Sequence, residues 1–252
     1  MWTKIINPVT NKNVNINSIL GRKILYNYLK NSNKKLSNTS KLSKDNNYCI
    51  HKKYEIREKP RHYNDMNEED KYQKEVYEYA SKIMKKNNYK TVVDVGCGSA
   101  FKLIKYLDEY DTLGIETEPC YSMLIEKYPN RNWKLSGKKE TNFSKKPLTY
   151  KPDLVICSDV IEHIIDPDEL IKYLLSLDAK KYIISTPCRQ RLCDLKRFRS
   201  AKWNGPPVNK GHVREWTMKE LQKYLGQYFT ILESKYCEKQ KECQYHLLSK
   251  SN

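Results

Sequence analysis

The 252-residue sequence lacks several features that each define a class of protein. It contains no apolar run close to the roughly 18 residues that a membrane-spanning helix needs. Its start, MWTKIINPVT, includes no continuous apolar block of the kind found in signal peptides. The eight cysteines are scattered and form no CxxC pair, which excludes zinc-finger and zinc-ribbon modules. We therefore expect a soluble cytoplasmic protein whose cysteines are reduced thiols.

Acidic residues are also in the minority, with 30 aspartates and glutamates against 47 lysines and arginines. The excess is concentrated in residues 1–62, which hold 14 basic residues and three acidic ones. Within this part, Lys30–Asn47 is nearly free of apolar residues and cannot bury enough surface to offset the entropy lost on ordering. The composition therefore predicts a short helical module at residues 1–31, a basic flexible linker at 32–62 and a folded domain at 63–252.

Two interpretations of this basic tail stay open. Its lysines and arginines can bind the phosphates of a nucleic acid without sequence preference. Alternatively, the tail is a solvated, lysine-rich linker with no partner, which is the interpretation we favour.

The N-terminal module has a helical pattern of its own. Apolar residues recur at helical spacing from Ile19 to Leu29, and Ser18 is placed to cap that helix. The stretch Ile6–Asn31 resembles a short N-P-x-T…GRKIL module found in proteins of large DNA viruses. That resemblance implies a viral protein acting in the host cytoplasm and an adaptor role for the module.

The segment Thr91–Leu103, TVVDVGCGSAFKL, is an apolar strand followed by a glycine turn and a helix start. Its glycines, Gly96 and Gly98, allow a ligand to approach the backbone closely. Glu116 ends the next apolar run, where an acid can accept hydrogen bonds from both ribose hydroxyls. These features predict a nucleoside-binding site.

The third glycine of the dinucleotide-binding pattern is absent, since Phe101 occupies its position. Asp94 would repel a pyrophosphate but attract an ammonium group. The segment resembles motif I of class I S-adenosylmethionine-dependent methyltransferases. This resemblance implies that S-adenosylmethionine is the cofactor and is bound by Asp94, Gly96, Cys97, Gly98 and Glu116.

Helices and strands alternate along the rest of the chain, which indicates an α/β fold with a mostly parallel sheet flanked by helices. The class I methyltransferase resemblance implies a Rossmann-like sheet closed by an antiparallel pair, Phe229–Ser234 and Gln244–Leu248. The expected strands before that pair are Thr91–Val95, Thr112–Ile115, Trp133–Leu135, Leu154–Cys157 and Lys181–Ser185, and the expected helices are 67–86, 99–110, 120–128, 167–177 and 217–225.

A second group of polar residues follows the apolar strand at residues 154–157. Glu162 and His163 stand at the strand end, where His163 can act as a general base on a hydroxyl group. The alternative, that both side chains are structural, is equally open. The segment resembles the motif after strand four in methyltransferases of the ubiquinone-biosynthesis type, which implies that Asp159 and Val160 line the methionine part of the cofactor.

A third group lies in NGPPVNKGHVREW, Asn204–Trp216, after the fifth strand of the domain. Its prolines predict a rigid loop over the mouth of the site. Arg214 suits a phosphate or carboxylate, Trp216 a ring face, and Glu215 and His212 hydroxyl groups. The alternative is a structural loop in which Trp216 is buried under the last helix.

Residues 60–250 together are similar to class I methyltransferases associated with sugar and surface-glycan biosynthesis, and the GPP…HVREW segment is the most distinctive part. The resemblance implies an acceptor hydroxyl or amine on a sugar, nucleotide sugar or glycan precursor. His163 and His212 are the candidate bases, supported by Glu215. We expect no metal ligands, because no acids are clustered at metal-binding spacing.

Two other functions remain open at this point. One is a nucleic-acid (RNA or cap) or protein methyltransferase that uses the basic tail to hold its substrate. The other is a non-catalytic module that binds S-adenosylmethionine. The sequence gives no indication of the oligomeric state.

Overall fold

The computed structural model describes residues 42–51, 53–61, 69, 72–136, 148–194 and 205–251, together with residues 4–6, 12–15, 17–18, 20–22 and 24. The chain forms two compact units, Met1–Lys41 and Leu42–Asn252. No described helix is long and apolar enough to cross a membrane.

The smaller unit contains a two-stranded antiparallel sheet, β1 (Lys4–Ile6) and β2 (Asn13–Asn15). Ser18 Oγ accepts a hydrogen bond of 3.0 Å from the backbone N–H of Gly21, as expected of a capping residue. Most of the predicted helix after Ser18, and the first part of the predicted linker, lie outside the described residues.

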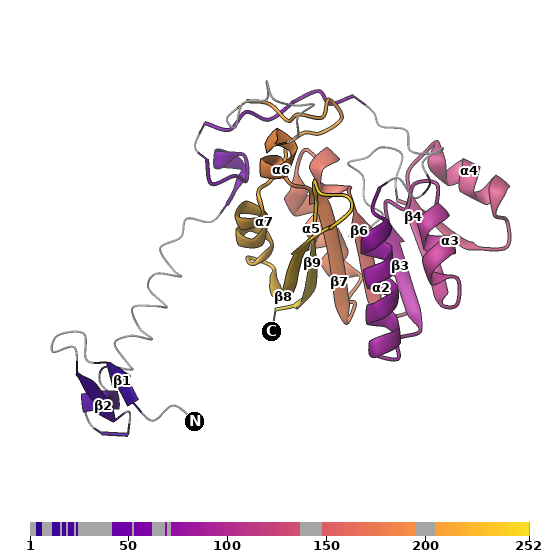
Figure 1. The fold of residues 1–252 in the computed structure, drawn as a ribbon. Helices are drawn as coiled ribbons and strands as arrows, with labels where there is room; N and C mark the ends of the chain where they lie inside the picture. Colours follow the sequence, from indigo (N-terminus) through magenta and orange to yellow (C-terminus); the bar gives the residue numbers. More distant parts are fainter. Residues whose placement is uncertain are drawn as a thin grey trace. The chain divides into compact units, whose positions relative to one another are not determined.

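The larger unit is built on a seven-stranded sheet in the order β5–β4–β3–β6–β7–β9–β8 (Figure 1). Strands β3 to β7 pair in parallel, whereas β9 is antiparallel to both β7 and β8. This confirms the predicted Rossmann-like sheet with its closing antiparallel pair. The strands are β3 (Thr91–Val95), β4 (Asp111–Glu116), β5 (Asn132–Leu135), β6 (Leu154–Ser158), β7 (Lys181–Pro187), β8 (Phe229–Tyr236) and β9 (Cys243–Lys250).

Helices cover both faces of this sheet (Figure 1). The α-helices are α2 (Lys74–Lys86), α3 (Phe101–Leu107), α4 (Cys120–Lys127), α5 (Pro167–Ser176), α6 (Arg189–Asp194) and α7 (Met218–Leu225), and the short 3-10 turns are η1 (Lys44–Asn46) and η2 (Ile161–His163). A capping box begins α7, since Thr217 and Glu220 exchange side-chain to backbone hydrogen bonds.

The sheet has two separate apolar cores because alternate residues of each strand point to opposite faces. Val92 of β3 packs in the core that contains residues of α2, α3 and α4. Its neighbours Val93 and Val95 pack in the core that contains residues of α5 and α7. Burial on both faces explains why β3 and β6 are continuous apolar runs in the sequence.

The prediction of a flexible linker at 32–62 is wrong for residues 42–61. Leu42, Tyr48, Cys49 and Tyr54 are at most 3% exposed and belong to the same core as Trp216. These apolar side chains follow directly after the polar stretch and bury enough surface to offset the entropy of ordering the segment. The remaining part of the predicted linker, residues 32–41, lies outside the described residues.

A buried ion pair fixes α6 to α7. Arg189 Nη2 lies 2.6 Å from both carboxylate oxygens of Glu220, and the two side chains are only 3% and 4% exposed. Glu220 also accepts a hydrogen bond from the backbone N–H of Ile50, so the pair joins the segment 42–61 to the domain.

Removing one partner of this pair leaves a buried charge without compensation. We expect Arg189→Met to lower the free energy of unfolding by about 3–5 kcal/mol, measured by urea denaturation of the full chain. The control is Lys74→Met, which breaks an exposed pair with Glu78 on α2. That change should cost less than about 1 kcal/mol, and equal losses in the two variants would contradict this assignment.

Candidate active site

The turn after β3 has the backbone conformation that requires glycine. Gly96 and Gly98 have φ values of +75° and +54°. A Cβ atom at Gly96 would overlap Val160 Cγ2 on the neighbouring segment. The backbone N–H of Gly96 donates a hydrogen bond of 2.8 Å to the carbonyl of Ile115 at the end of β4. The predicted cofactor turn therefore lies directly between β4 and Val160.

Glu116 is fixed by backbone donors at the end of β4. Its Oε2 accepts a hydrogen bond of 2.7 Å from the N–H of Gly98, and its Oε1 accepts one of 2.8 Å from the N–H of Thr117. Oε1 also accepts a hydrogen bond of 3.2 Å from Thr117 Oγ1, so several donors fix the direction of the Glu116 carboxylate.

Asp94 lies at the end of β3 and is fully buried. Tyr77 of α2 donates a hydrogen bond of 2.7 Å to Asp94 Oδ2. Tyr77 was not predicted as a site residue, although it is one of the buried residues of the amphipathic helix α2. Tyr77 fixes the direction of the Asp94 carboxylate.

A cavity of about 550 Å³ opens beside the cofactor turn, a volume typical of small-molecule sites. Of the site residues singled out in the sequence, six line this cavity: Gly96, Cys97, Asp159, Glu162, His163 and His212. The other predicted residues are not part of this wall among the described residues. Asp94, Gly98, Glu116 and Val160 support the turn, and Arg214, Glu215 and Trp216 lie behind His212.

Asp159 follows β6 in a left-handed conformation, with a φ of +54°. Its Oδ1 accepts a hydrogen bond of 2.7 Å from Ser185 Oγ, and its backbone N–H donates to the Ser185 carbonyl. Burial raises the pKa of the Asp159 carboxyl above its usual value, while the Ser185 hydrogen bond acts in the opposite direction. Ser185 was not singled out from the sequence, although it pairs in register with Ser158 at the end of the adjacent strand.

Glu162 is fully buried at the centre of the cavity wall. Its Oε2 accepts a hydrogen bond of 2.9 Å from Thr186 Oγ1, whereas Oε1 has no hydrogen-bond donor among the described residues. Burial raises the pKa of Glu162 well above its usual value, and the nearby negative charge of Asp159 adds to this effect.

His163 is held by the loop that precedes α7. Its Nδ1 lies 2.8 Å from the carbonyl oxygen of Gly211. Because a carbonyl can only accept, Nδ1 carries the hydrogen and the neutral ring has its lone pair on Nε2. That Nε2 lies 4.0 Å from Glu162 Oε1, and the His163 side chain is 24% exposed.

His212 is oriented in the same way by a carboxylate. Its Nδ1 lies 2.7 Å from Glu215 Oε1, and the Glu215 carboxylate also accepts the backbone N–H groups of Val208 and Asn209. These donors keep Glu215 an acceptor, so His212 Nδ1 donates and Nε2 bears the lone pair. Glu215, a predicted catalytic residue, thus contacts the His212 ring and is not among the residues that line the cavity.

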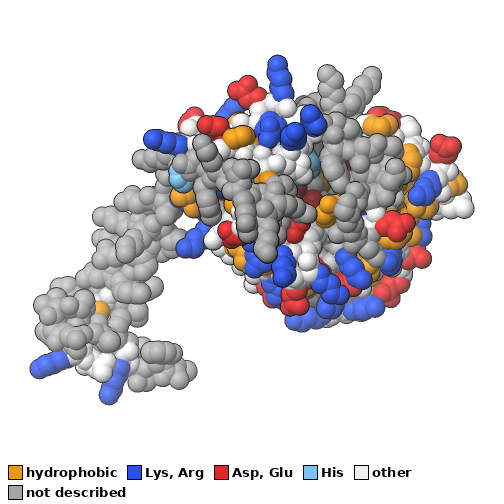
Figure 2. All heavy atoms as spheres, turned by 45° about the horizontal axis from the view of Figure 1, so that its top comes forward, with side chains coloured by type: hydrophobic (Ala, Val, Ile, Leu, Met, Phe, Trp, Pro, Cys, Tyr) orange, Lys and Arg blue, Asp and Glu red, His pale blue; other side chains and the backbone are white. Residues whose placement is uncertain are grey.

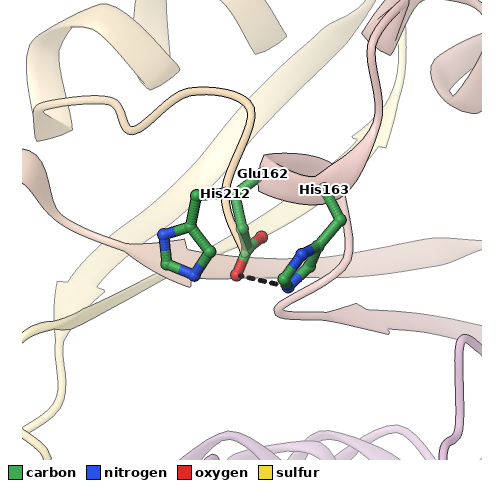
Figure 3. A group of neighbouring side chains, drawn as sticks. All are labelled: Glu162, His163 and His212. Carbon is green, nitrogen blue, oxygen red and sulfur yellow. Dashed lines mark ion pairs between the residues drawn. The ribbon is translucent and has the colours of Figure 1, made fainter. Parts of the chain in front are cut away.

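The two imidazole rings flank the Glu162 carboxylate (Figure 3). Their centroids are 5.1 Å apart and the ring planes are nearly perpendicular. One ligand-type atom from each of Glu162, His163 and His212 lies within 4.8 Å of the others, a spacing that can hold a metal ion. No metal ligands were predicted, because the spacing of these residues along the chain does not show that they lie together in the fold.

Arg214 and Trp216 were predicted to contact an acceptor. In the structure their side chains instead make contacts within the protein. Arg214 is 1% exposed, and its guanidinium donates to the carbonyls of Ile164 and Ile165 at 2.8 Å each. Trp216 is fully buried, stacks on Tyr224, and donates through Nε1 to a backbone carbonyl. Both side chains therefore stabilise the loop that carries His212. This agrees with the alternative prediction of a structural loop in which Trp216 is buried.

Comparisons with known proteins identify the family to which this fold belongs. Residues 65–229 match a family model described as a methyltransferase domain. A comparison with curated proteins finds no match.

Several solved structures share the fold. An S-adenosylmethionine-dependent methyltransferase from Clostridium acetobutylicum is 18% identical, covering 72% of this chain and 92% of its own, with a TM-score of 0.54. Magnesium protoporphyrin IX methyltransferase from Synechocystis, solved with bound S-adenosylhomocysteine, is also 18% identical with a TM-score of 0.54, covering 71% and 84%. A methyltransferase from Aquifex aeolicus is 15% identical with a TM-score of 0.50, covering 72% and 95%.

The family match extends over more than half of the chain and includes the cofactor turn, Glu162, His163 and His212. The sheet order agrees with it, because β9 inserts antiparallel beside β7 in an otherwise parallel sheet. The chain therefore belongs to the methyltransferase-domain family and is an S-adenosylmethionine-dependent methyltransferase.

Proposed function

We propose that this enzyme transfers the methyl group of S-adenosylmethionine to a hydroxyl group of a polar small molecule, of the class of sugars, nucleotide sugars or glycan precursors. An amine on the same kind of acceptor would react in the same position. The observation that carries the proposal is the pair of imidazole lone pairs, on His163 and His212, beside the cofactor turn.

The proposed cofactor site consists of the residues around the turn after β3 and the segment after β6. Asp94 and Glu116 supply the negative charge for the ammonium group and the acceptors for the ribose hydroxyls. The remaining members are Gly96, Cys97, Gly98, Asp159 and Val160. The overlap that a side chain at Gly96 would cause with Val160 supports this arrangement, because it leaves bare backbone where the ligand approaches.

Methyl transfer is an in-line displacement. The acceptor oxygen forms a bond to the methyl carbon, the bond between sulfur and that carbon breaks, and its electron pair stays on sulfur in S-adenosylhomocysteine. Holding the two reactants in line accounts for roughly 7–11 kcal/mol of the barrier in favourable cases. A neutral hydroxyl is a weak nucleophile and must also lose its proton, so the lone pairs of His163 and His212 activate it.

Polar residues in the cavity wall support a hydrophilic acceptor. Its wall includes the side chains of Gln73, Lys102, Asn209 and Lys210 in addition to the Glu162 cluster. The fold alone does not select the acceptor, since one neighbour is named for methylating magnesium protoporphyrin IX. The resemblance of the GPP…HVREW segment to glycan-associated enzymes supports the sugar class, and the N-terminal resemblance supports a viral protein of the host cytoplasm.

Nucleic acid is a weaker candidate for the acceptor. Acidic and basic side chains are interspersed over the visible face of the larger unit (Figure 2). In addition, part of the basic segment, from Leu42 to Arg61, is used to pack the domain.

The cofactor site can be tested by binding alone. We expect Asp94→Asn to weaken binding of S-adenosylhomocysteine by about 10–100-fold, since a charge-assisted hydrogen bond contributes about 1.5–3 kcal/mol. Isothermal titration calorimetry measures this. The control is Asp178→Asn, at a carboxylate that pairs with Lys151 and Lys250 at the protein surface. Equal affinity in wild type and Asp94→Asn would rule out this cofactor site.

The role of the histidines can be separated from cofactor binding. We expect His163→Ala and His212→Ala each to lower kcat by roughly 10²–10⁴-fold and to leave the affinity for S-adenosylhomocysteine unchanged. The control is His51→Ala, at an exposed histidine outside the cavity. Single-turnover transfer of labelled methyl groups measures the effect, and normal turnover in both cavity variants would refute the assignment.

The acceptor class is tested with pooled acceptors. We expect labelled methyl groups to appear in a pool of nucleotide sugars and free glycans, but not in pooled RNA or protein. Labelling of RNA alone, with a rate that falls steeply as salt increases, would show that a nucleic acid is the acceptor. Binding of S-adenosylmethionine with no transfer to any pool would favour a non-catalytic binding module.

A further inference from the structure

We infer that Glu162, His163 and His212 form a binding site for a divalent transition-metal ion, and that this ion holds the acceptor oxygen for methyl transfer. The inference rests on the proposed methyl transfer for the role of the ion, and with the ion bound the two histidines act as its ligands instead of as direct bases. The binding of the ion can be tested separately.

The geometry of the three side chains is the first argument. Their ligand-type atoms lie within 4.8 Å of one another, and the Glu162 carboxylate stands between the two rings (Figure 3). Metal–nitrogen and metal–oxygen bonds of about 2.0–2.2 Å place neighbouring ligand atoms roughly 3 Å apart. On metal binding, rotation of the three side chains would bring their ligand atoms from within 4.8 Å to this shorter spacing. The carboxylate and one ring come from η2, and the other ring comes from the loop before α7.

The second argument is the orientation of the rings. Metal-binding histidines usually donate their other ring N–H to a carboxylate or a backbone carbonyl, which fixes the tautomer. Both arrangements occur in this cluster: His212 donates to Glu215, and His163 donates to the carbonyl of Gly211. Each ring therefore presents an Nε2 lone pair, the form in which neutral imidazole binds a metal.

The third argument is a buried oxygen atom with unused acceptor capacity. Glu162 is fully buried, and its Oε1 has no hydrogen-bond donor among the described residues, although it faces the His163 ring. A buried carboxylate is costly unless a positive charge or donors compensate it. Asp159 lines the same cavity and adds a second negative group. A divalent cation bound at Glu162 would compensate the negative charges of the Glu162 and Asp159 carboxylates.

The ligand set indicates the class of metal. Two imidazole nitrogens and one carboxylate oxygen suit Mn²⁺, Fe²⁺, Co²⁺ or Zn²⁺, whereas Mg²⁺ and Ca²⁺ prefer oxygen ligands. Three protein ligands leave coordination positions open, as in catalytic rather than structural sites. An acceptor hydroxyl in such a position loses its proton more easily, because the cation stabilises the oxygen anion. The proton passes to water, since both imidazole lone pairs are then bound to the cation.

The experiment is a titration of the tag-free full chain with Co²⁺ after treatment with EDTA and desalting. We expect one Co²⁺ per chain, with weak visible ligand-field absorption typical of nitrogen and oxygen ligands. Glu162→Gln, His163→Gln and His212→Gln should each lose this binding, and the control His51→Gln should retain it. Glu215→Gln should weaken it on the order of 10–100-fold, the usual effect of removing a partner of a ligating histidine.

Two further measurements guard against variants that simply unfold. Co²⁺ should raise the Tm of wild type and of His51→Gln but not of the three ligand variants. The ligand variants should still bind S-adenosylhomocysteine with wild-type affinity, which requires a folded domain.

The outcomes separate this inference from the proposed function. Absence of Co²⁺ binding, intense thiolate charge-transfer bands, or binding that persists in the ligand variants would overturn the metal site. Methyl transfer that continues unchanged in EDTA would overturn the role of the ion and leave the histidines as direct bases. Co²⁺ binding that depends on the three ligands, with no transfer to any acceptor, would establish the site and refute the proposed function.

Discussion

The candidate active site depends on the contact between two loops that are distant in the sequence. The carbonyl oxygen of Glu162 accepts a hydrogen bond of 2.7 Å from the N–H of Val213, and His163 donates to the loop at Gly211. Arg214 adds two hydrogen bonds to the backbone that follows η2. Without these bonds His212 would have no fixed position relative to Glu162. The chemistry proposed for the cavity therefore rests on hydrogen bonds between loops, in which side-chain and backbone donors meet backbone carbonyls.

The segment 42–61 stabilises one of these loops from the other side. Its Arg57 and Arg61 donate backbone hydrogen bonds to the carbonyls of Val213 and Lys210. Tyr54 accepts a hydrogen bond through its hydroxyl oxygen from the N–H of Glu215. The loop is thus held between η2 and a segment that precedes the methyltransferase sheet in the sequence. These contacts supply hydrogen-bond partners for several buried polar groups of the loop, including the backbone N–H of Glu215.

Local patterns in the sequence predicted the strands and the glycine turn after β3, whereas the closing antiparallel pair was predicted from the resemblance to class I methyltransferases. Apolar runs predicted β3 and β6, and the glycines at 96 and 98 predicted a turn whose φ values are positive. Tertiary packing decided the rest. Residues 32–62 were predicted to be a linker because lysine and asparagine dominate their composition, although apolar residues follow Lys41. The spacing of residues in HVREW does not show which of its side chains are buried. Glu162 and His212 lie close together because two loops contact each other, and a local sequence pattern cannot predict such a contact.

The close approach of Gly96 to Val160 also constrains how this sequence can change over time. A side chain at position 96 would occupy the volume of a Val160 methyl group, and the positive φ at this position adds strain for any residue but glycine. A smaller residue at 160 would relieve the overlap but not the strain. Substitutions at positions 96 and 160 are therefore not independent of each other. Among related enzymes, the size of the residue at position 160 should be limited wherever the glycine at 96 is kept.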